Sequence, residues 1–325
     1  MMRFGKLAVW QVALIAAAVA VVQADPQPLE ILRQSILARA TVDFSGIRTV
    51  VIFQSGQKVQ GVEQQIDCDA PDRLRITVLA PEHQRGMLCL TSGQEHWEYT
   101  PSTGRVVHTE RLSTEQLVQT RLEELQRIAG SMKMHYVGVE SIGGRQAHVV
   151  KIYTQAGVPV KKTWVDTERY VELKTQRFDS HGQIKSSVYY TRIDYSPSFA
   201  EGAFDFQTPS GATIVEAKRP TERMSLEQAE QKAGFHAVLP GYLPPGYRFC
   251  ANRTAVIDVN GKATIWLSFS NGADSFSVFE RPATGTLDPV EHERSITWQR
   301  GSYRFTLMGA LAADELQRVK ASIQP

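Results

Sequence analysis

The stretch VPVKKTWVDTERYVELKTQRFDSHGQIKSSVYYTRIDY, residues Val158–Tyr195, decides the fold class of this chain. It divides into three extended runs rich in Val, Thr, Tyr, Trp and Ile, which are Pro159–Val165, Tyr170–Phe178 and Gln183–Tyr195. Short polar turns separate the runs at residues 166–168 and 179–182. Because β-branched and aromatic residues favour strands and short polar gaps favour hairpins, the stretch predicts an antiparallel meander.

The chain before this meander continues the strand-and-turn pattern and adds two helices. One helix is predicted at Pro28–Ala40, with Pro at its first position. The other is predicted at Thr114–Ala129, where Ser113 and Gln116 form a capping box. The second helix carries one apolar stripe, which fits two interpretations: ordinary core packing, or a helix laid over the open face of a curved sheet.

A second domain follows a polar boundary. A last short strand is predicted at Phe204–Phe206, and the polar, Pro-containing run Thr208–Arg223 is typical of a linker. We place the two domains at residues 25–216 and 225–325, with a linker at residues 217–224. The fold class is therefore α+β and mainly antiparallel β, with a large curved sheet followed by a smaller α+β domain.

The N-terminus has the pattern of a secretory signal peptide. Arg3 and Lys6 precede the apolar run Val12–Val22, and Val22-Gln23-Ala24 places small residues at a cleavage site. We expect residues 1–24 to be removed on export. The alternative is a retained N-terminal anchor, although the apolar run is too short to span a bilayer comfortably.

The charge balance argues against nucleic-acid binding. Removal of residues 1–24 takes away two basic residues and no acidic one, so Lys+Arg falls to 36 − 2 = 34 against 34 Asp+Glu. Non-specific nucleic-acid binding requires an excess of Lys and Arg that neutralises phosphates. We expect partners to be recognised by shape and apolar surface instead.

The cysteines suggest a candidate disulfide but no metal site. Cys68 and Cys89 lie in the same sheet-like region, and an exported protein can join such a pair. The alternative is that these two cysteines and Cys250 are small buried hydrophobic residues. Their spacing does not match a zinc site, and no cofactor is expected.

The sequence lacks the patterns of common catalytic sites. It contains no GxSxG, HExxH or CxxC motif and no phosphate-cradling glycine loop. The eight histidines are scattered, with four in predicted strands: His96, His108, His135 and His148. Asp166 and Glu168 stand between two strands, where acidic residues are typical of a turn. We therefore expect a protein that is not an enzyme.

The aromatic and aliphatic residues of successive strands indicate a different kind of site. The inner face of a large curved sheet that does not close must meet a helix, a ligand or a partner. Either the two helices fill this face, or an apolar groove remains for an acyl chain or an apolar peptide. A one-residue slip in register exchanges the two faces of a strand. Our candidate groove residues are Phe53, Ile76, Leu88, Trp97, Ile152, Trp164 and Tyr189.

Several motifs in the first domain resemble a known superfamily over about residues 28–216. The resemblance is to the closing half of the LolA-like lipoprotein carriers, with their W-x-D turn, D-x-x-G hairpin and terminal F-x-F-x-x-P-x-G. The matching segments are Trp164–Tyr170, Phe178–Gly182, Tyr190–Tyr195 and Ala203–Glu216. The resemblance implies a LolA-like open half-barrel with covering helices.

The second domain resembles one branch of that superfamily. Leu239–Phe249 and Gly309–Val319 are similar to the C-terminal domain of the RseB/MucB regulators of sigma-E. This resemblance implies a periplasmic protein that binds the periplasmic domain of a membrane anti-sigma factor, shields it from proteolysis, and releases it on a lipid signal. The alternative is a periplasmic carrier or chaperone for lipids or acylated lipoproteins. A hydrolase is a third hypothesis, for which the sequence assembles no residues.

Overall fold

The computed structural model describes residues 27–54, 56–216, 223–259, 261–271, 274–283, 290–292, 295–309, 311 and 313–324. The predicted signal peptide and most of the predicted linker lie outside these residues. No helix within the described ranges is long and apolar enough to cross a membrane.

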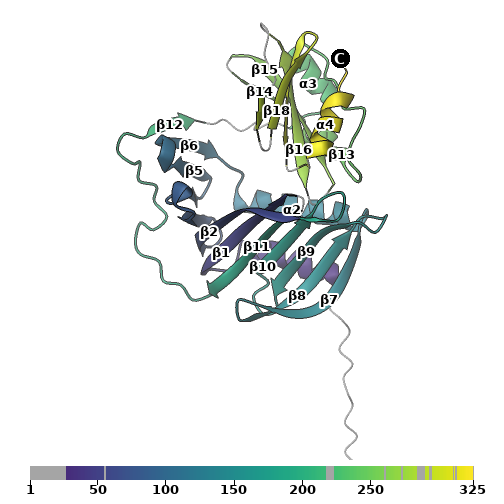
Figure 1. Cartoon of the computed structure of the whole chain (residues 1–325). Helices are drawn as coiled ribbons and strands as arrows, with labels where there is room; N and C mark the ends of the chain where they lie inside the picture. Colours follow the sequence, from purple (N-terminus) through teal and green to yellow (C-terminus); the bar gives the residue numbers. More distant parts are fainter. Residues whose placement is uncertain are drawn as a thin grey trace, which may run out of the picture.

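The first part of the chain forms one large sheet of 12 strands in the order β12-β6-β5-β4-β3-β2-β1-β11-β10-β9-β8-β7 (Figure 1). Apart from the parallel pair β6 and β12, all neighbours are antiparallel. The sheet curves but does not close, since β12 and β7 form its two edges. The strands are β1 (Phe44–Gln54), β2 (Gln57–Asp69), β3 (Arg73–Ala80), β4 (Leu88–Ser92), β5 (Glu95–Thr100), β6 (Arg105–Glu110), β7 (Lys133–Ile142), β8 (Arg145–Tyr153), β9 (Pro159–Asp166), β10 (Glu172–Phe178), β11 (Ile184–Asp194) and β12 (Thr213–Glu216).

The predicted meander is confirmed and occupies the middle of this sheet. Strands β9, β10 and β11 pair in sequence, and β11 then pairs with β1. This last pairing joins the two halves of the sheet, because β1 begins the run β1–β6. Two short 3-10 helices, η1 (Glu82–Gln84) and η2 (Pro101–Thr103), lie in connections of the first half.

Two helices cover one face of the sheet, as the sequence predicted. Helix α1 is Pro28–Ala38, two residues shorter than expected, and α2 is Thr114–Ala129. The predicted capping box of α2 is present, with the Ser113 side chain accepting a hydrogen bond from the backbone N–H of Gln116 at 3.2 Å. Ile31 and Leu32 of α1 and Leu125 of α2 share a core with sheet residues that include Val150 and Ile152. The helices therefore bury one half of this face.

The end of the first domain differs from the prediction. Residues 204–206 do not form a strand; instead the Phe206 ring stacks on Trp97 at 4.6 Å. The segment crosses the face of the sheet opposite the helices and ends in β12, which lies inside the run that we interpreted as a linker. The polar composition of Thr208–Arg223 fits a short, mostly exposed edge strand as well as it fits a linker.

The second domain has its own sheet and core. Its 7-stranded sheet has the order β13-β15-β16-β19-β18-β17, and β14 pairs with β15. Phe269, Phe276, Phe305 and Leu307 are fully buried there. The elements are α3 (Leu226–Ala233), β13 (Arg248–Phe249), η3 (Ala251–Arg253), β14 (Ala255–Asp258), β15 (Ala263–Ser270), β16 (Ser275–Pro282), β17 (Val290–His292), β18 (Ser295–Arg300), β19 (Tyr303–Gly309) and α4 (Ala313–Ser322).

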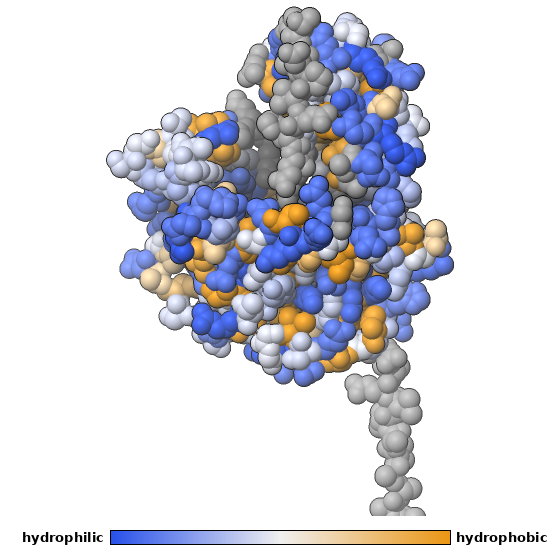
Figure 2. Space-filling model, in the orientation of Figure 1, coloured by the Kyte–Doolittle hydropathy of each residue, from blue (hydrophilic) through white to orange (hydrophobic). Residues whose placement is uncertain are grey.

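The surface is largely polar. On the face drawn in Figure 2, hydrophobic residues form small patches among hydrophilic ones. Val137 and Val139 of the edge strand β7 and Ile214 of β12 are among the exposed large hydrophobic residues. The apolar space available to a ligand must therefore be sought inside the fold.

Candidate functional site

A cavity of about 310 Å3 lies between α1, α2 and the face of the large sheet that the helices cover. Its volume is at the low end of the range of about 300–1,000 Å3 that is usual for ligand pockets. Apolar side chains form much of its wall. They come from both helices and from five strands, and include Ile36, Phe44, Ile66, Leu74, Ile76, Leu117, Val118, Val188 and Tyr190. We call this cavity the groove.

The groove also carries an excess of positive charge. Two acidic residues, Asp72 and Glu172, line it together with five arginines: Arg39, Arg48, Arg73, Arg111 and Arg121. Two of the five also have carboxylate partners outside the lining, because Arg73 binds Asp69 and Arg121 lies 3.7 Å from Glu124. Polar residues hold two of these guanidinium groups in place. Arg48 donates to Gln64 at 2.8 Å, and Arg111 donates to Thr91 at 2.8 Å. An anionic group next to an apolar chain is the chemistry that this lining favours.

Glu172 offsets only part of this charge, because its carboxylate also pairs with Lys161. It accepts hydrogen bonds from Lys161 at 2.8 Å and from Thr163 at 2.8 Å. Burial alone would raise the pKa of Glu172, but the charges of Lys161 and Arg39 outweigh burial and hold this pKa well below its usual range. The carboxylate is therefore ionised, and its hydrogen bonds to Lys161 and Thr163 hold neighbouring strands together at the wall of the groove.

Helix α2 connects the groove to the second domain. Arg121 lines the groove, and Glu124, three residues further along the helix, lies 3.7 Å from it. The same Glu124 lies 3.4 Å from Arg253 of the second domain. One carboxylate thus contacts a groove residue and a residue of the other domain.

Of the seven candidate groove residues, Ile76 lines the groove and the other six do not. Ile152 lies on the same face but is buried beneath α1, in the core that contains Ile31 and Leu32. Phe53 lies near the end of β1, where it is only half-buried.

Four candidates lie on the opposite face of the sheet. Trp164 is buried there with Val149 and Leu173, and its ring N–H donates to Glu140 at 2.7 Å. Tyr189 pairs with Lys174, whose ammonium group lies 4.5 Å from the Trp164 ring. Leu88 and Trp97 belong to β4 and β5, where Trp97 stacks on Phe206. The sequence pattern located the strands, but the choice of face depended on helices that come from distant parts of the chain.

Tyr190 is the groove residue that the prediction missed by one position. It is 7% exposed, lines the groove, and packs edge-on against Phe44 at 5.8 Å. Burial raises the pKa of the Tyr190 hydroxyl to about 12. The arginines were also missed. Arg48 and Arg73 lie on β1 and β3, where arginine normally marks the solvated face. The other three come from a helix or from residues that follow an element, and only the folded chain brings them to the groove.

The candidate disulfide is not formed. All three cysteines are free. Cys68 and Cys89 belong to β2 and β4, and β3 lies between these strands, with Leu74 opposite Cys68 and Ile76 opposite Cys89. Burial raises the pKa of Cys68 to about 11 and also raises the pKa of Cys89, so both thiols stay protonated and inert near neutral pH.

The turn acids have an architectural role, as the sequence indicated. Asp166 is fully buried and accepts hydrogen bonds from the backbone N–H groups of Glu168 at 2.8 Å and Arg169 at 2.9 Å. It also binds the Arg145 guanidinium and the Tyr195 hydroxyl. The four strand histidines contact different partners, and within the described ranges no group of three His, Cys, Asp or Glu side chains is placed to hold a metal ion.

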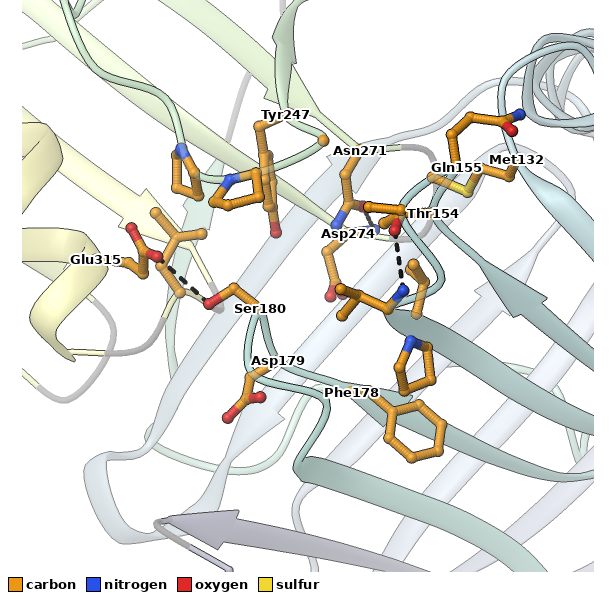
Figure 3. A pocket seen from close by; sticks show the side chains of 18 of the residues that line it. Met132, Thr154, Gln155, Phe178, Asp179, Ser180, Tyr247, Asn271, Asp274 and Glu315 are labelled. Atoms are coloured by element: carbon orange, nitrogen blue, oxygen red, sulfur yellow. Dashed lines mark hydrogen bonds between the residues drawn. The ribbon is translucent and has the colours of Figure 1, made fainter.

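A second cavity, of about 460 Å3, lies where the two domains meet. Figure 3 shows Phe178, Asp179 and Ser180 of the β10–β11 hairpin on one side and Tyr247 and Glu315 of the second domain on the other. Ser180 donates to Glu315 at 3.3 Å. The meander that decides the fold thus also contacts the second domain.

One buried carboxylate anchors that hairpin. Asp274 of the second domain, 5% exposed at its side chain, binds Arg177 at 2.8 Å and also binds Lys185. These two cations flank the hairpin turn on β10 and β11. The two cations compensate for the burial of the Asp274 carboxylate, and the two ion pairs join the second domain to the β10–β11 hairpin.

The two sheets, the groove and the interdomain contact define a two-domain protein with an open half-barrel followed by an α+β domain. Solved structures of MucB have this architecture. A MucA/MucB complex from Pseudomonas aeruginosa has 17% identity and a TM-score of 0.59, with 92% of this chain and 98% of that chain covered. MucB in complex with MucA(peri) has 16% identity and a TM-score of 0.58, covering 92% and 99%. MucB alone has 17% identity and a TM-score of 0.52, covering 92% and 98%.

The chain therefore has the two-domain MucB fold, and the resemblance to the RseB/MucB type is confirmed at the level of the fold. A family model described as "-like: Uncharacterized protein" matches residues 71–198. No curated protein matches the sequence.

Proposed function

We propose that this chain is a periplasmic, non-enzymatic regulator that binds the periplasmic domain of a membrane anti-sigma factor and senses a lipid or acylated lipoprotein in its groove. The fold carries the proposal, because the similarity to MucB, which has been solved together with MucA, extends over 92% of the chain and both domains. The export pattern at residues 1–24 supports the proposed location.

The partner is tested by titrating the mature chain with the purified periplasmic segment of a single-span anti-sigma factor encoded beside it. We expect saturable binding by calorimetry. A chain that instead captures only acylated lipoproteins has the alternative function, a carrier or chaperone. The groove supports this second candidate as well, since a carrier also needs an apolar cavity for an acyl chain.

The groove itself is tested with a matched pair of arginine variants. Arg39 at the end of α1 lines the groove, whereas Arg33 of the same helix is exposed and pairs with Glu30 outside it. A charge-assisted hydrogen bond contributes about 1.5–3 kcal/mol, so Arg39→Gln should weaken binding of lysophosphatidylglycerol by about tenfold or more. Arg33→Gln should bind like the wild type.

Binding of a monoacylglycerol, which has the acyl chain but no phosphate, separates the charge of the ligand from its acyl chain. We expect it to bind more weakly than lysophosphatidylglycerol and to be insensitive to Arg39→Gln. Filling the groove with Ile76→Trp should block both lipids, with the exposed Val139→Trp on β7 as the control. Equal binding of both lipids by all four variants would remove the groove from the proposal.

A further inference from the structure

Strand β12 is attached to the large sheet by few interactions. Its four residues pair in parallel with Arg105–His108 of β6, at the edge of the sheet (Figure 1). Thr213, Ile214 and Glu216 are exposed and Val215 is half-buried. Because β12 buries little apolar surface, side-chain contacts contribute a large share of its attachment.

One imidazole supplies a side-chain contact to β12. His108 Nδ1 lies 2.7 Å from Glu216 of β12, and His108 Nε2 contacts Glu95 of β5. The ring stacks on Trp97 at 3.8 Å, which fixes its orientation. A neutral imidazole has one N–H donor, whereas the imidazolium cation has two. With a carboxylate at each ring nitrogen, both contacts are satisfied only when His108 is protonated.

The surrounding charges favour that protonated form. Glu110 lies directly across from Glu95 in the β5–β6 ladder, so three carboxylates gather on this face around one imidazole. Burial alone would lower the pKa of His108, but the hydrogen bonds to Glu95 and Glu216 outweigh burial and raise it. The raised pKa extends the range of pH over which the cation persists.

We propose that His108 is a proton-operated latch that holds β12 on β6 through Glu216. Protonated His108 joins β12 to β5 and β6; loss of the proton leaves one carboxylate without a donor and weakens the attachment. Release of β12 exposes the backbone edge of β6. This latch is independent of the groove and of the proposed partner.

The direction of the pH effect follows from linkage. A histidine whose pKa is higher in the folded protein stabilises the folded form fully below its unfolded pKa, and this contribution is lost as pH rises through the folded pKa. β12 should therefore be held most firmly at mildly acidic pH. It should open more often as the pH rises above the ordinary histidine pKa of 6.5.

Hydrogen exchange of the full mature chain, followed by mass spectrometry on peptides covering residues 208–216, tests the latch. After correction for the intrinsic pH dependence of exchange, we expect opening of β12 to increase about tenfold between pH 5.5 and 8.5, the factor for one lost charge-assisted hydrogen bond. Glu216→Gln and His108→Gln should open equally at all pH values.

The matched control is Glu98→Gln. Glu98 lies on β5 like Glu95 and accepts from His96 at 3.1 Å, but on the other face of the sheet and away from β12. This variant should retain the wild-type pH dependence at residues 208–216. The latch is overturned if NMR titration gives His108 a pKa no higher than the ordinary histidine value of 6.5, or if the protection of β12 in Glu216→Gln still changes with pH.

Discussion

Asp166 in the half-barrel and Glu280 in the second domain are both fully buried, yet their surroundings shift the pKa values of the two carboxyl groups in opposite directions. Asp166 has Arg145 and two backbone N–H donors, which outweigh burial and lower its pKa. Glu280 accepts one hydrogen bond, from the backbone N–H of Val238 at 2.8 Å, and its other oxygen has no partner among the described residues. Burial raises the pKa of Glu280 to about 8.

The difference shows that burial alone does not determine the charge of a carboxyl group. A buried carboxylate persists where donors and a cation surround it, and a buried carboxyl group stays protonated where they do not. In the half-barrel, the ionised carboxylate of Asp166 holds the turn between β9 and β10. In the second domain, the protonated carboxyl group of Glu280 holds the segment at Val238.

Asp166→Ala should produce the largest change in stability that this comparison predicts. The variant removes the buried acceptor of the Glu168 and Arg169 backbone N–H groups and of the Arg145 side chain, so we expect a loss of about 3 kcal/mol in the free energy of unfolding at pH 7. Urea denaturation measures it. Because the folded-state pKa of Asp166 is lowered, the stabilising effect is present above the ordinary aspartate pKa of 3.8 and disappears as pH falls through the folded pKa.

Glu168→Gln is the control for this prediction. Glu168 also contacts Arg145, at 2.8 Å, but its side chain is 74% exposed. An exposed pair contributes about 0–1 kcal/mol, so this variant should be nearly as stable as the wild type. If both variants lose the same stability, the buried charge of Asp166 is not what holds the turn.

The second test uses the pH dependence of the second domain. Folded Glu280 keeps its proton up to about pH 8, while in the unfolded chain it loses the proton above about 4.5. Unfolding thus releases one proton in this window, and this group lowers the free energy of unfolding by about 1.4 kcal/mol per pH unit as pH rises. Chemical denaturation between pH 5 and 8 measures the slope.

Glu280→Gln removes the ionisation and should flatten that slope for the transition of the second domain. Asp166→Ala should leave the same slope unchanged, because Asp166 is ionised in both states over this range. A wild-type transition that is already independent of pH between 5 and 8 would show that Glu280 is ionised when folded.

The smallest expected change in stability comes from two matched helix caps. Ser113 of α2 and Ser225 of α3 each form a capping box, with Gln116 and Gln228 as the partners at 3.2 Å. Ser→Ala at such a position costs about 1 kcal/mol. If the domains unfold separately, each variant should shift one transition in calorimetry and not the other. A single transition that both variants shift would show that the domains unfold together.

The local elements were accessible from the sequence. The meander and α2 with its cap at Ser113 were predicted from residues that are neighbours along the chain. Strand propensity, turn residues and capping boxes act over a few positions, so a sequence contains all the information they need. The family motifs extended this to the fold, which the similarity to MucB confirms.

The groove was not accessible in the same way. Ile76 was assigned to it, but Trp164 and Tyr189 were placed on the wrong face and Tyr190 was missed. Alternation along a strand shows which residues share a face, but it does not show which face the helices cover. A single-residue change of register exchanges the two faces.

What the sequence alone determined is therefore the succession of strands, turns and helices, and the two-domain order. Only the tertiary structure decided which face α1 and α2 cover, that five arginines converge there, and that β12 returns to β6 beside His108. Those features depend on contacts between residues far apart in the chain, such as His108 and Glu216. No local preference encodes such contacts, since the burial of one segment depends on where every other segment packs.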